Sequence, residues 1–198
     1  MSRQKTAFCS ILAIGVLIMF NLLGCSPGRK FDRYQSKDPD IGVSMLYPSG
    51  WEYSEDRGSI EKYACVLFLE PVGKSKHSLR SSIMVKVVKK SDMPDNLSEA
   101  GAAADDFMGK ASKLRDFKLI SRKGSKLFGE KAEDMVFSYK AFNKPLPNIG
   151  GFVSAEERDV VVIKNGKCYS ISLVSQKDAF EGLDKVFSYV VKTIKLQR

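Results

Sequence analysis

The chain has 198 residues, of which 43% are hydrophobic and 28% are charged. This length and composition are typical of one folded domain and exclude a disordered, collagen-like or coiled-coil chain. The formal net charge is +9, from 32 Lys and Arg residues against 23 Asp and Glu residues. The single histidine, His77, excludes metal sites that need several histidines.

The first 25 residues predict an export signal. Two basic residues, Arg3 and Lys5, precede an apolar run from Ile11 to Phe20. A basic start, a short apolar core and a small residue before the cleavage point are the features of a secretory signal. The apolar run is much shorter than the ~20 residues that a bilayer-spanning helix needs.

A short motif closes the leader. Leu22, Leu23, Gly24 and Cys25 resemble the lipobox of bacterial lipoproteins. The resemblance implies that the thiol of Cys25 receives a diacylglyceryl group, that a peptidase cuts before it, and that the new amino group is then acylated. We therefore expect a lipoprotein signal peptide over residues 1–24 and an anchor of several acyl chains, which holds a protein stably on a membrane. An uncleaved signal anchor and a leader cut elsewhere are the alternatives.

The residues after the lipobox bear on location and domain boundaries. An Asp directly after the acylated cysteine resembles a signal for retention in the inner membrane. Ser26 stands there instead, which favours the outer membrane, facing the periplasm, if the host is Gram-negative. Residues 25–40 are polar and predict a lipidated tether before a domain over residues 41–198. Loss of the leader removes two positive charges and no acid, which lowers the net charge from +9 to +7.

The first half of the domain predicts strands. Residues 41–47 alternate apolar and polar side chains and end in a turn over residues 48–50. Residues 63–69 are apolar on both faces, as in a central strand, and residues 83–88 alternate again. The stretch between them, residues 71–80, is rich in Pro, Gly, Ser and Lys and predicts a loop.

The second half predicts two helices separated by further strands. The spacing of apolar residues predicts a helix over residues 96–114. Residues 117–122 and 126–128 flank Lys-Gly-Ser and predict a hairpin, and residues 135–139 predict another strand.

The last hairpin carries the strongest turn signal. Residues 160–163 and 168–174 flank Asn165-Gly166, which favours a two-residue hairpin, and residues 178–194 predict the second helix. Short links favour antiparallel pairing, and each amphipathic helix must cover a sheet. The sequence therefore predicts an α+β domain.

A family resemblance adds detail. Residues 41–51, Ile-Gly-Val-Ser-Met-Leu-Tyr-Pro-Ser-Gly-Trp, resemble the opening strand of PsbP-like proteins, which closes with Tyr-Pro-x-Gly-Trp. Residues 166–171 and 187–194 are similar to the last hairpin and closing helix of the family. The resemblance implies the Mog1/PsbP fold, an antiparallel β-sheet with helices on both faces. It implies no enzyme, and some members of the family are bacterial envelope lipoproteins.

Two cysteines remain in the mature domain. Cys65 and Cys168 form an even pair, and an oxidising compartment would permit a disulfide between them. Both lie in predicted strands, where free buried cysteines are also common. The sequence leaves both states open.

The sequence offers no constellation for catalysis. His77 lies in a Lys-rich predicted loop, no nucleophile elbow precedes a helix, and neither an EF-hand loop nor a P-loop occurs. The acidic residues fall on predicted exposed faces and in loops, beside lysines. We therefore expect no enzyme, no cofactor and no metal site.

One predicted loop is unusually apolar. Residues 141–153 contain two prolines and two glycines together with Phe142, Leu146, Ile149 and Phe152. Such a loop packs over a sheet edge or contacts a partner. The basic surface could likewise be solvated or lie against anionic headgroups. Nucleic acid is not expected as a partner of an exported protein.

These observations converge on one hypothesis of function. We expect a membrane-anchored envelope lipoprotein whose noncatalytic PsbP-like domain binds or stabilises a protein complex. Its partners would be membrane lipid, through acylated Cys25, and an envelope protein of unknown identity. The alternative is a lipoprotein that carries a small ligand or a metal.

Overall fold

The computed structural model describes residues 30–58, 62–73, 77–146 and 149–197. Residues 31–198 form one compact unit. The predicted signal peptide lies outside the described residues, as do Leu22, Leu23, Gly24 and Cys25.

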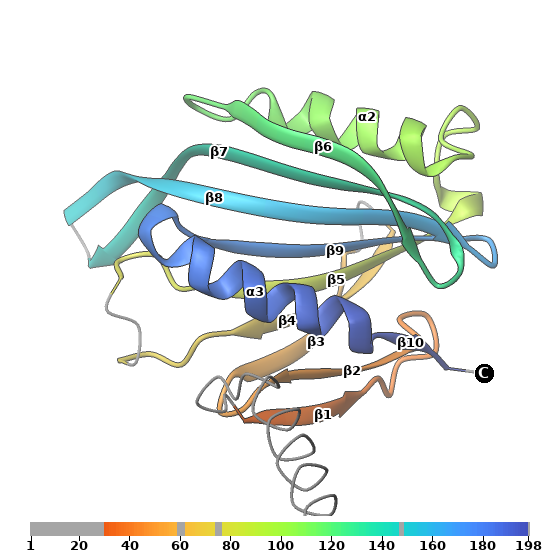
Figure 1. Ribbon diagram of the computed structural model, residues 1–198, viewed down its shortest axis with the longest axis horizontal. Helices are drawn as coiled ribbons and strands as arrows, with labels where there is room; N and C mark the ends of the chain where they lie inside the picture. The colour runs from red at the N-terminus through yellow and green to blue at the C-terminus, as the bar shows by residue number, and fades with distance from the viewer. Residues whose placement is uncertain (1–29, 59–61, 74–76, 147–148, 198) are drawn as a thin grey trace, which may run out of the picture. The chain divides into compact units, whose positions relative to one another are not determined.

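The described residues form strands and helices in an order close to the prediction (Figure 1). The elements are β1 (Phe31–Gln35), β2 (Val43–Pro48), β3 (Glu52–Gly58), β4 (Tyr63–Leu69), β5 (Ser82–Lys89), the 3₁₀ turn η1 (Lys90–Asp92), α2 (Ala100–Ala111), β6 (Lys118–Leu127), β7 (Glu130–Leu146), β8 (Ile149–Lys164), β9 (Lys167–Gln176), α3 (Lys177–Thr193) and β10 (Lys195–Leu196). None of the helices in the described ranges is long and apolar enough to cross a membrane.

The strands form two antiparallel sheets. The larger sheet has the strand order β3-β4-β5-β9-β8-β7-β6, and the smaller sheet has the order β1-β2-β10. Asn165 and Gly166 form the β8–β9 turn, and both have positive φ, as the predicted hairpin requires.

The two helices cover opposite faces of the larger sheet. Because side chains alternate along a strand, Val160 and Val162 of β8 face one way and Val161 faces the other. Val160 and Val162 belong to the core beneath α3, whereas Val161 packs with Ala103 and Ala104 of α2. The predicted α+β fold, an antiparallel sheet with helices on both faces, is confirmed (Figure 1).

The larger core lies between α3, the smaller sheet and the larger sheet. Phe180, Leu183, Phe187 and Val190 form the buried face of α3. They pack with buried side chains of β2, β4, β5 and β9. Full burial of each large apolar side chain contributes about 1.5–3 kcal/mol, so this core is the main source of stability.

The folded domain begins earlier than predicted. The expected tether over residues 25–40 is too long, because Phe31–Gln35 forms strand β1 and pairs with β2. Tyr34 is only 2% exposed, and its hydroxyl donates to Glu55 at 2.6 Å. A strand at the edge of a small sheet can be largely polar, because its outer face meets water. The polar composition of these residues therefore reflects an edge strand.

Two further expectations about the strands were wrong. Residues 117–128 form no hairpin, because β6 runs without interruption through Lys123-Gly124-Ser125 and pairs with β7. Residues 141–153 are not a loop, because β7 extends to Leu146 and β8 starts at Ile149. Gly124 of β6 and Gly151 of β8 are exposed residues within these strands, so a glycine in the sequence did not mark a turn there.

Candidate functional sites

A charged pocket of about 300 Å³ opens at one end of the larger sheet. Its lining includes Asp40, Arg57, Lys62, Tyr63, Lys89 and Asp92. These residues come from the β1–β2 turn, from the end of β3, from the start of β4, and from β5 and η1. The pocket therefore lies between strands of the larger sheet and the β1–β2 connection of the smaller sheet. We call this feature the charged pocket.

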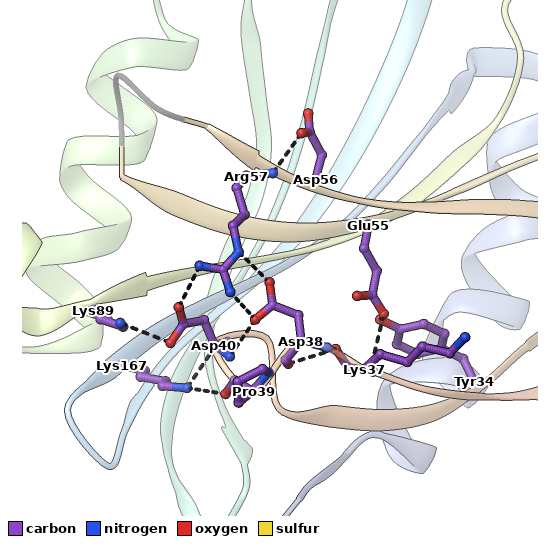
Figure 2. Close-up of polar contacts among 11 residues, drawn as sticks. Tyr34, Lys37, Asp38, Pro39, Asp40, Glu55, Asp56, Arg57, Lys89 and Lys167 are labelled. Carbon is purple, nitrogen blue, oxygen red and sulfur yellow. Dashed lines mark hydrogen bonds and ion pairs between the residues drawn. The ribbon is translucent and has the colours of Figure 1, made fainter.

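The turn before β2 forms one wall of the charged pocket (Figure 2). The backbone amide of Asp40 donates to the Asp38 carboxylate at 2.8 Å, which closes a short side-chain turn. The Arg57 guanidinium donates through Nε to Asp38 at 2.7 Å, and its Nη1 lies 3.0 Å from Asp40. One arginine on β3 thus holds two aspartates of the turn.

Two lysines tie the same turn to the larger sheet (Figure 2). Lys89 of β5 lies 3.0 Å from the Asp40 carboxylate, and its hydrogen bond lowers the pKa of Asp40. Lys167 of β9 donates to the backbone carbonyls of Pro39 and Asp40 at 3.1 and 2.8 Å. The wall is therefore held by ion pairs and hydrogen bonds from three strands.

The opposite side of the charged pocket depends on a glycine. A Cβ atom at Gly58 would lie 2.2 Å from the Tyr63 ring, so only glycine lets that ring approach the β3 backbone. The ammonium group of Lys86 lies 4.2 Å from the centre of the same ring. At the rim, Lys62 is 69% exposed and lies 3.5 Å from Asp92. The pocket thus offers cations and carboxylates to a charged ligand.

A two-stranded arm extends from the other end of the sheet. The pairing of β6 with β7 reaches Ser138, and that of β9 with β8 stops at Ala155. Beyond these points, residues 140–146 and 149–154 pair only with each other among the described strands. We call these residues the arm, which projects past the neighbouring strands in Figure 1.

The arm carries all four residues predicted as a partner loop, and the side chains of two of them are described. Phe142 and Phe152 face each other across the arm, with ring centres 5.4 Å apart, and are 60% and 48% exposed. The Arg115 guanidinium lies 4.3 Å from the centre of the Phe152 ring. Leu146 and Ile149 are paired across the arm, but their side chains lie outside the described residues.

A group of buried acids lies under α2. Asp159 of β8 is 0% exposed, and its Oδ2 has no hydrogen-bond partner. Burial raises the pKa of Asp159 well above its usual range, and the nearby Glu157 raises it further. Burial also raises the pKa of Glu157, which accepts a 3.0 Å hydrogen bond from the Tyr139 hydroxyl. Because two neighbouring carboxylates repel each other, protonation of at least one of these two groups is favoured.

The two cysteines are free and too far apart to pair. Cys65 on β4 lies opposite Lys86 on β5, and Cys168 on β9 lies opposite Val88 on β5. Because β5 separates them, their Cα atoms are at least about 10 Å apart, beyond the ~4.4–6.8 Å of a disulfide. Burial raises the pKa of both thiols, that of Cys168 to about 11. The disulfide is excluded by strand order.

The lone histidine lies beside an acid near the start of α3. His77 Nδ1 is 3.4 Å from the Asp178 carboxylate, which is well exposed. Among the described residues, no group of three or more His, Cys, Asp or Glu side chains could hold a metal ion. The contact between His77 and Asp178 resembles a surface ion pair.

No protein-family model and no curated protein matches the sequence. Solved structures do match. Cyanobacterial PsbP (CyanoP) from Synechocystis sp. PCC 6803 aligns over 87% of this chain and 96% of its own, with a TM-score of 0.58 and 17% identity. The Ran-binding protein Mog1p of Saccharomyces cerevisiae aligns over 85% and 96%, with a TM-score of 0.53 and 9% identity.

The domain has the PsbP/Mog1 fold. The same PsbP/Mog1 fold occurs in LpqN of Mycobacterium tuberculosis, a protein involved in cell envelope biogenesis, which aligns over 85% of this chain and 91% of its own, with a TM-score of 0.52 and 13% identity. The resemblance drawn from residues 41–51 is thereby confirmed at the level of the fold.

In this PsbP/Mog1 domain, the sequence indicated the residues of the arm but not those of the charged pocket. The aromatic residues of the arm stood out by composition, although their strand conformation did not. The charged pocket was missed, because Asp38-Pro39-Asp40 falls in the segment expected to be a tether. The local feature that could have indicated the charged pocket is the turn-forming sequence Asp-Pro-Asp.

Proposed function

We propose that this protein is a lipid-anchored lipoprotein of the cell envelope whose PsbP/Mog1-like domain binds a protein partner and catalyses no reaction. The charged pocket is the observation that carries the proposal, because it presents the exposed cations Arg57, Lys62 and Lys89 beside partly buried carboxylates on a fixed scaffold. Complementary charges across an interface steer a partner and set its register. Binding by this fold has a precedent in the Ran-binding protein Mog1p.

The location follows from the leader. Acylation of Cys25 would hold the mature chain on a membrane, and Ser26 favours the outer membrane, facing the periplasm, in a Gram-negative host. The involvement of LpqN in cell envelope biogenesis supports a role in the same compartment.

The alternative is a carrier of a small charged ligand. The charged pocket has about 300 Å³, which is at the lower end of the roughly 300–1,000 Å³ of small-molecule sites. Native mass spectrometry of the purified domain distinguishes the two functions, because a carrier retains the extra mass of its ligand.

A cross-linking experiment tests the protein partner. A photo-reactive amino acid in place of Lys62, at the rim of the charged pocket, is expected to form an adduct with one defined envelope protein in cells. The same substitution at Lys126, an exposed lysine on β6, serves as the matched control and should give no such adduct. Identical adduct patterns at both positions would count against a partner at the pocket.

The anchor has its own test. Cys25→Ala is expected to abolish lipid labelling and cleavage of the leader, because no thiol remains to receive the diacylglyceryl group. Cys9→Ala removes a cysteine within the leader and should leave both processes intact. Metabolic labelling with palmitate and a gel shift measure both. A Cys25→Ala variant that is still labelled and cut before residue 25 would refute the proposed anchor.

A further inference from the structure

The arm and the N-terminus of the domain lie at the same end of the strands. Phe31 pairs with Pro48, which leads through a short turn into Glu52 at the start of β3. From Glu52, one row of paired residues crosses the larger sheet through Leu69, Ser82, Val174 and Glu157. On β8, Glu157 follows the arm, whose last residue on this strand is Ser154. The chain therefore enters the domain at the end from which the arm projects.

The charged pocket lies at the opposite end. Gly58 pairs with Tyr63 at the far end of β3, and Lys89 pairs with Lys167 beside the β8–β9 turn. The domain thus has two functional ends, one with the arm and the chain entry, and the other with the charged pocket.

The proposed anchor lies close to the arm end in chain length. Six residue steps separate Cys25 from Phe31, which span at most about 21 Å when fully extended. This is about half the ~40–45 Å thickness of a bilayer. If Cys25 is acylated, as the proposed function requires, Phe31 stays within about 21 Å of the membrane surface, at the same end of the strands as the arm.

The exposed side chains of this end suit a membrane interface. Phe142 and Phe152 present two phenyl rings, and Val72, in the connection between β4 and β5, is 77% exposed. The Arg115 guanidinium lies over the Phe152 ring. Lys140, which donates to Ser154, lies two residues before Phe142 on the same face of β7. Aromatic rings favour the interfacial region of a bilayer, and basic side chains are attracted to anionic headgroups.

We propose that the arm docks on the membrane that holds the anchor, with Phe142 and Phe152 in the interfacial layer of an anionic leaflet and Arg115 among its headgroups. This inference rests on the proposed lipid anchor. Docking at this end turns the charged pocket away from the membrane, toward the aqueous compartment where its partner can reach it. A lipid surface is favoured over a protein because the chain entry holds the arm within its reach.

The test supplies the anchor chemically. A mature chain starting at Ser26 carries an N-terminal polyhistidine tag and binds vesicles of phosphatidylethanolamine and phosphatidylglycerol that contain a nickel-chelating lipid. The chain can be used without its leader, because every described core residue lies within residues 31–196. An environment-sensitive fluorophore is attached to Gly151→Cys on the arm or, as the matched control, to Gly124→Cys on β6.

Both positions suit the comparison. A Cβ atom at either glycine meets no atom within 4 Å, and both glycines are exposed in strands. The native thiols, with their raised pKa, leave the new cysteine as the reactive one at neutral pH. We expect a blue shift on vesicle binding for Gly151→Cys and none for Gly124→Cys. Phe142→Ser with Phe152→Ser should lower the membrane-bound population of the arm by about tenfold or more.

Three results would overturn the proposal. A Gly151→Cys label that does not respond shows that the arm stays in water, and equal responses at both positions show non-specific adsorption. An unresponsive label together with a protein adduct from a photo-reactive residue at Phe152 would assign the arm to a protein partner. None of these results depends on acylation of Cys25, which the Cys25→Ala experiment tests separately.

Discussion

Replacing Arg158 with Met is expected to lower the free energy of unfolding by roughly 3–5 kcal/mol. Arg158 lies on β8 and its side chain is only 14% exposed. It donates to both carboxylate oxygens of Asp134 on β7, at 2.9 and 2.7 Å. Its Nη1 also donates to Asp184 and Ser188 of α3, at 2.8 and 2.7 Å. One guanidinium thus joins α3 to two strands, and these bonds raise its own pKa further.

The large effect comes from the partner that remains. Asp134 is 5% exposed, so loss of Arg158 leaves a buried carboxylate without its bidentate partner. The double variant Arg158→Met with Asp134→Leu removes both charges and should be more stable than Arg158→Met alone. Arg158→Lys, which cannot form the fork, should fall between Met and the native residue. Urea unfolding measures all three, and a loss below about 1 kcal/mol for Arg158→Met would contradict the account.

Replacing Asp159 with Asn is expected to raise the free energy of unfolding near neutral pH by roughly 1–3 kcal/mol. Asp159 is fully buried under α2, its Oδ2 has no hydrogen-bond partner, and its Oδ1 accepts a long 3.4 Å hydrogen bond from Ser170. Asn keeps the shape of the side chain and stays neutral at every pH, so no charge has to be buried. Its amide can also donate to Glu157, which carries a raised pKa beside it.

The pH dependence of this gain has a definite sign. The folded-state pKa of Asp159 lies above its unfolded value of about 3.9, so the folded chain binds more protons between the two values. Native stability therefore falls as the pH rises through that window. The advantage of Asp159→Asn should be large at about pH 8 and nearly absent at about pH 4.

Thermal unfolding at several pH values measures this dependence. Asp106→Asn, on the exposed side of α2, is the matched control and should show no comparable change. An Asp159→Asn variant that is less stable than the native chain at every pH would show that the carboxylate is instead stabilised by its surroundings.

Both substitutions also separate stability from binding. Arg158 and Asp159 lie in the middle of β8, between the arm and the charged pocket, and belong to neither. A variant that changes stability without changing cross-linking at Lys62 or vesicle contact at Gly151 would confirm that binding at the two ends does not depend on these side chains of β8.

The apolar elements were predictable because their local pattern and their tertiary role agree. The buried face of α3 repeats at helical spacing, β4 is apolar on both faces because it is a central strand, and Asn165-Gly166 admits the positive φ of a tight hairpin turn. The leader and the lipobox are likewise linear signals, which stay predictions here because residues 1–29 lie outside the described part of the chain.

The polar elements were not predictable, because pairing partners rather than side chains define them. β1, β3 and β6 lie at sheet edges and expose most of their side chains, so no apolar period marks them. The arm is a strand pair in a segment whose prolines and glycines indicate a loop.

The sequence by itself determined the central strands, the amphipathic helices and hence the α+β class, because each depends on neighbours along the chain. Only the tertiary structure decided that β5 separates Cys65 from Cys168, and that Asp40 meets Arg57 and Lys89 in the charged pocket. It also decided that the arm lies at the end where the chain enters. These relations depend on strand order and register, which join residues distant in the chain and leave no local period to detect.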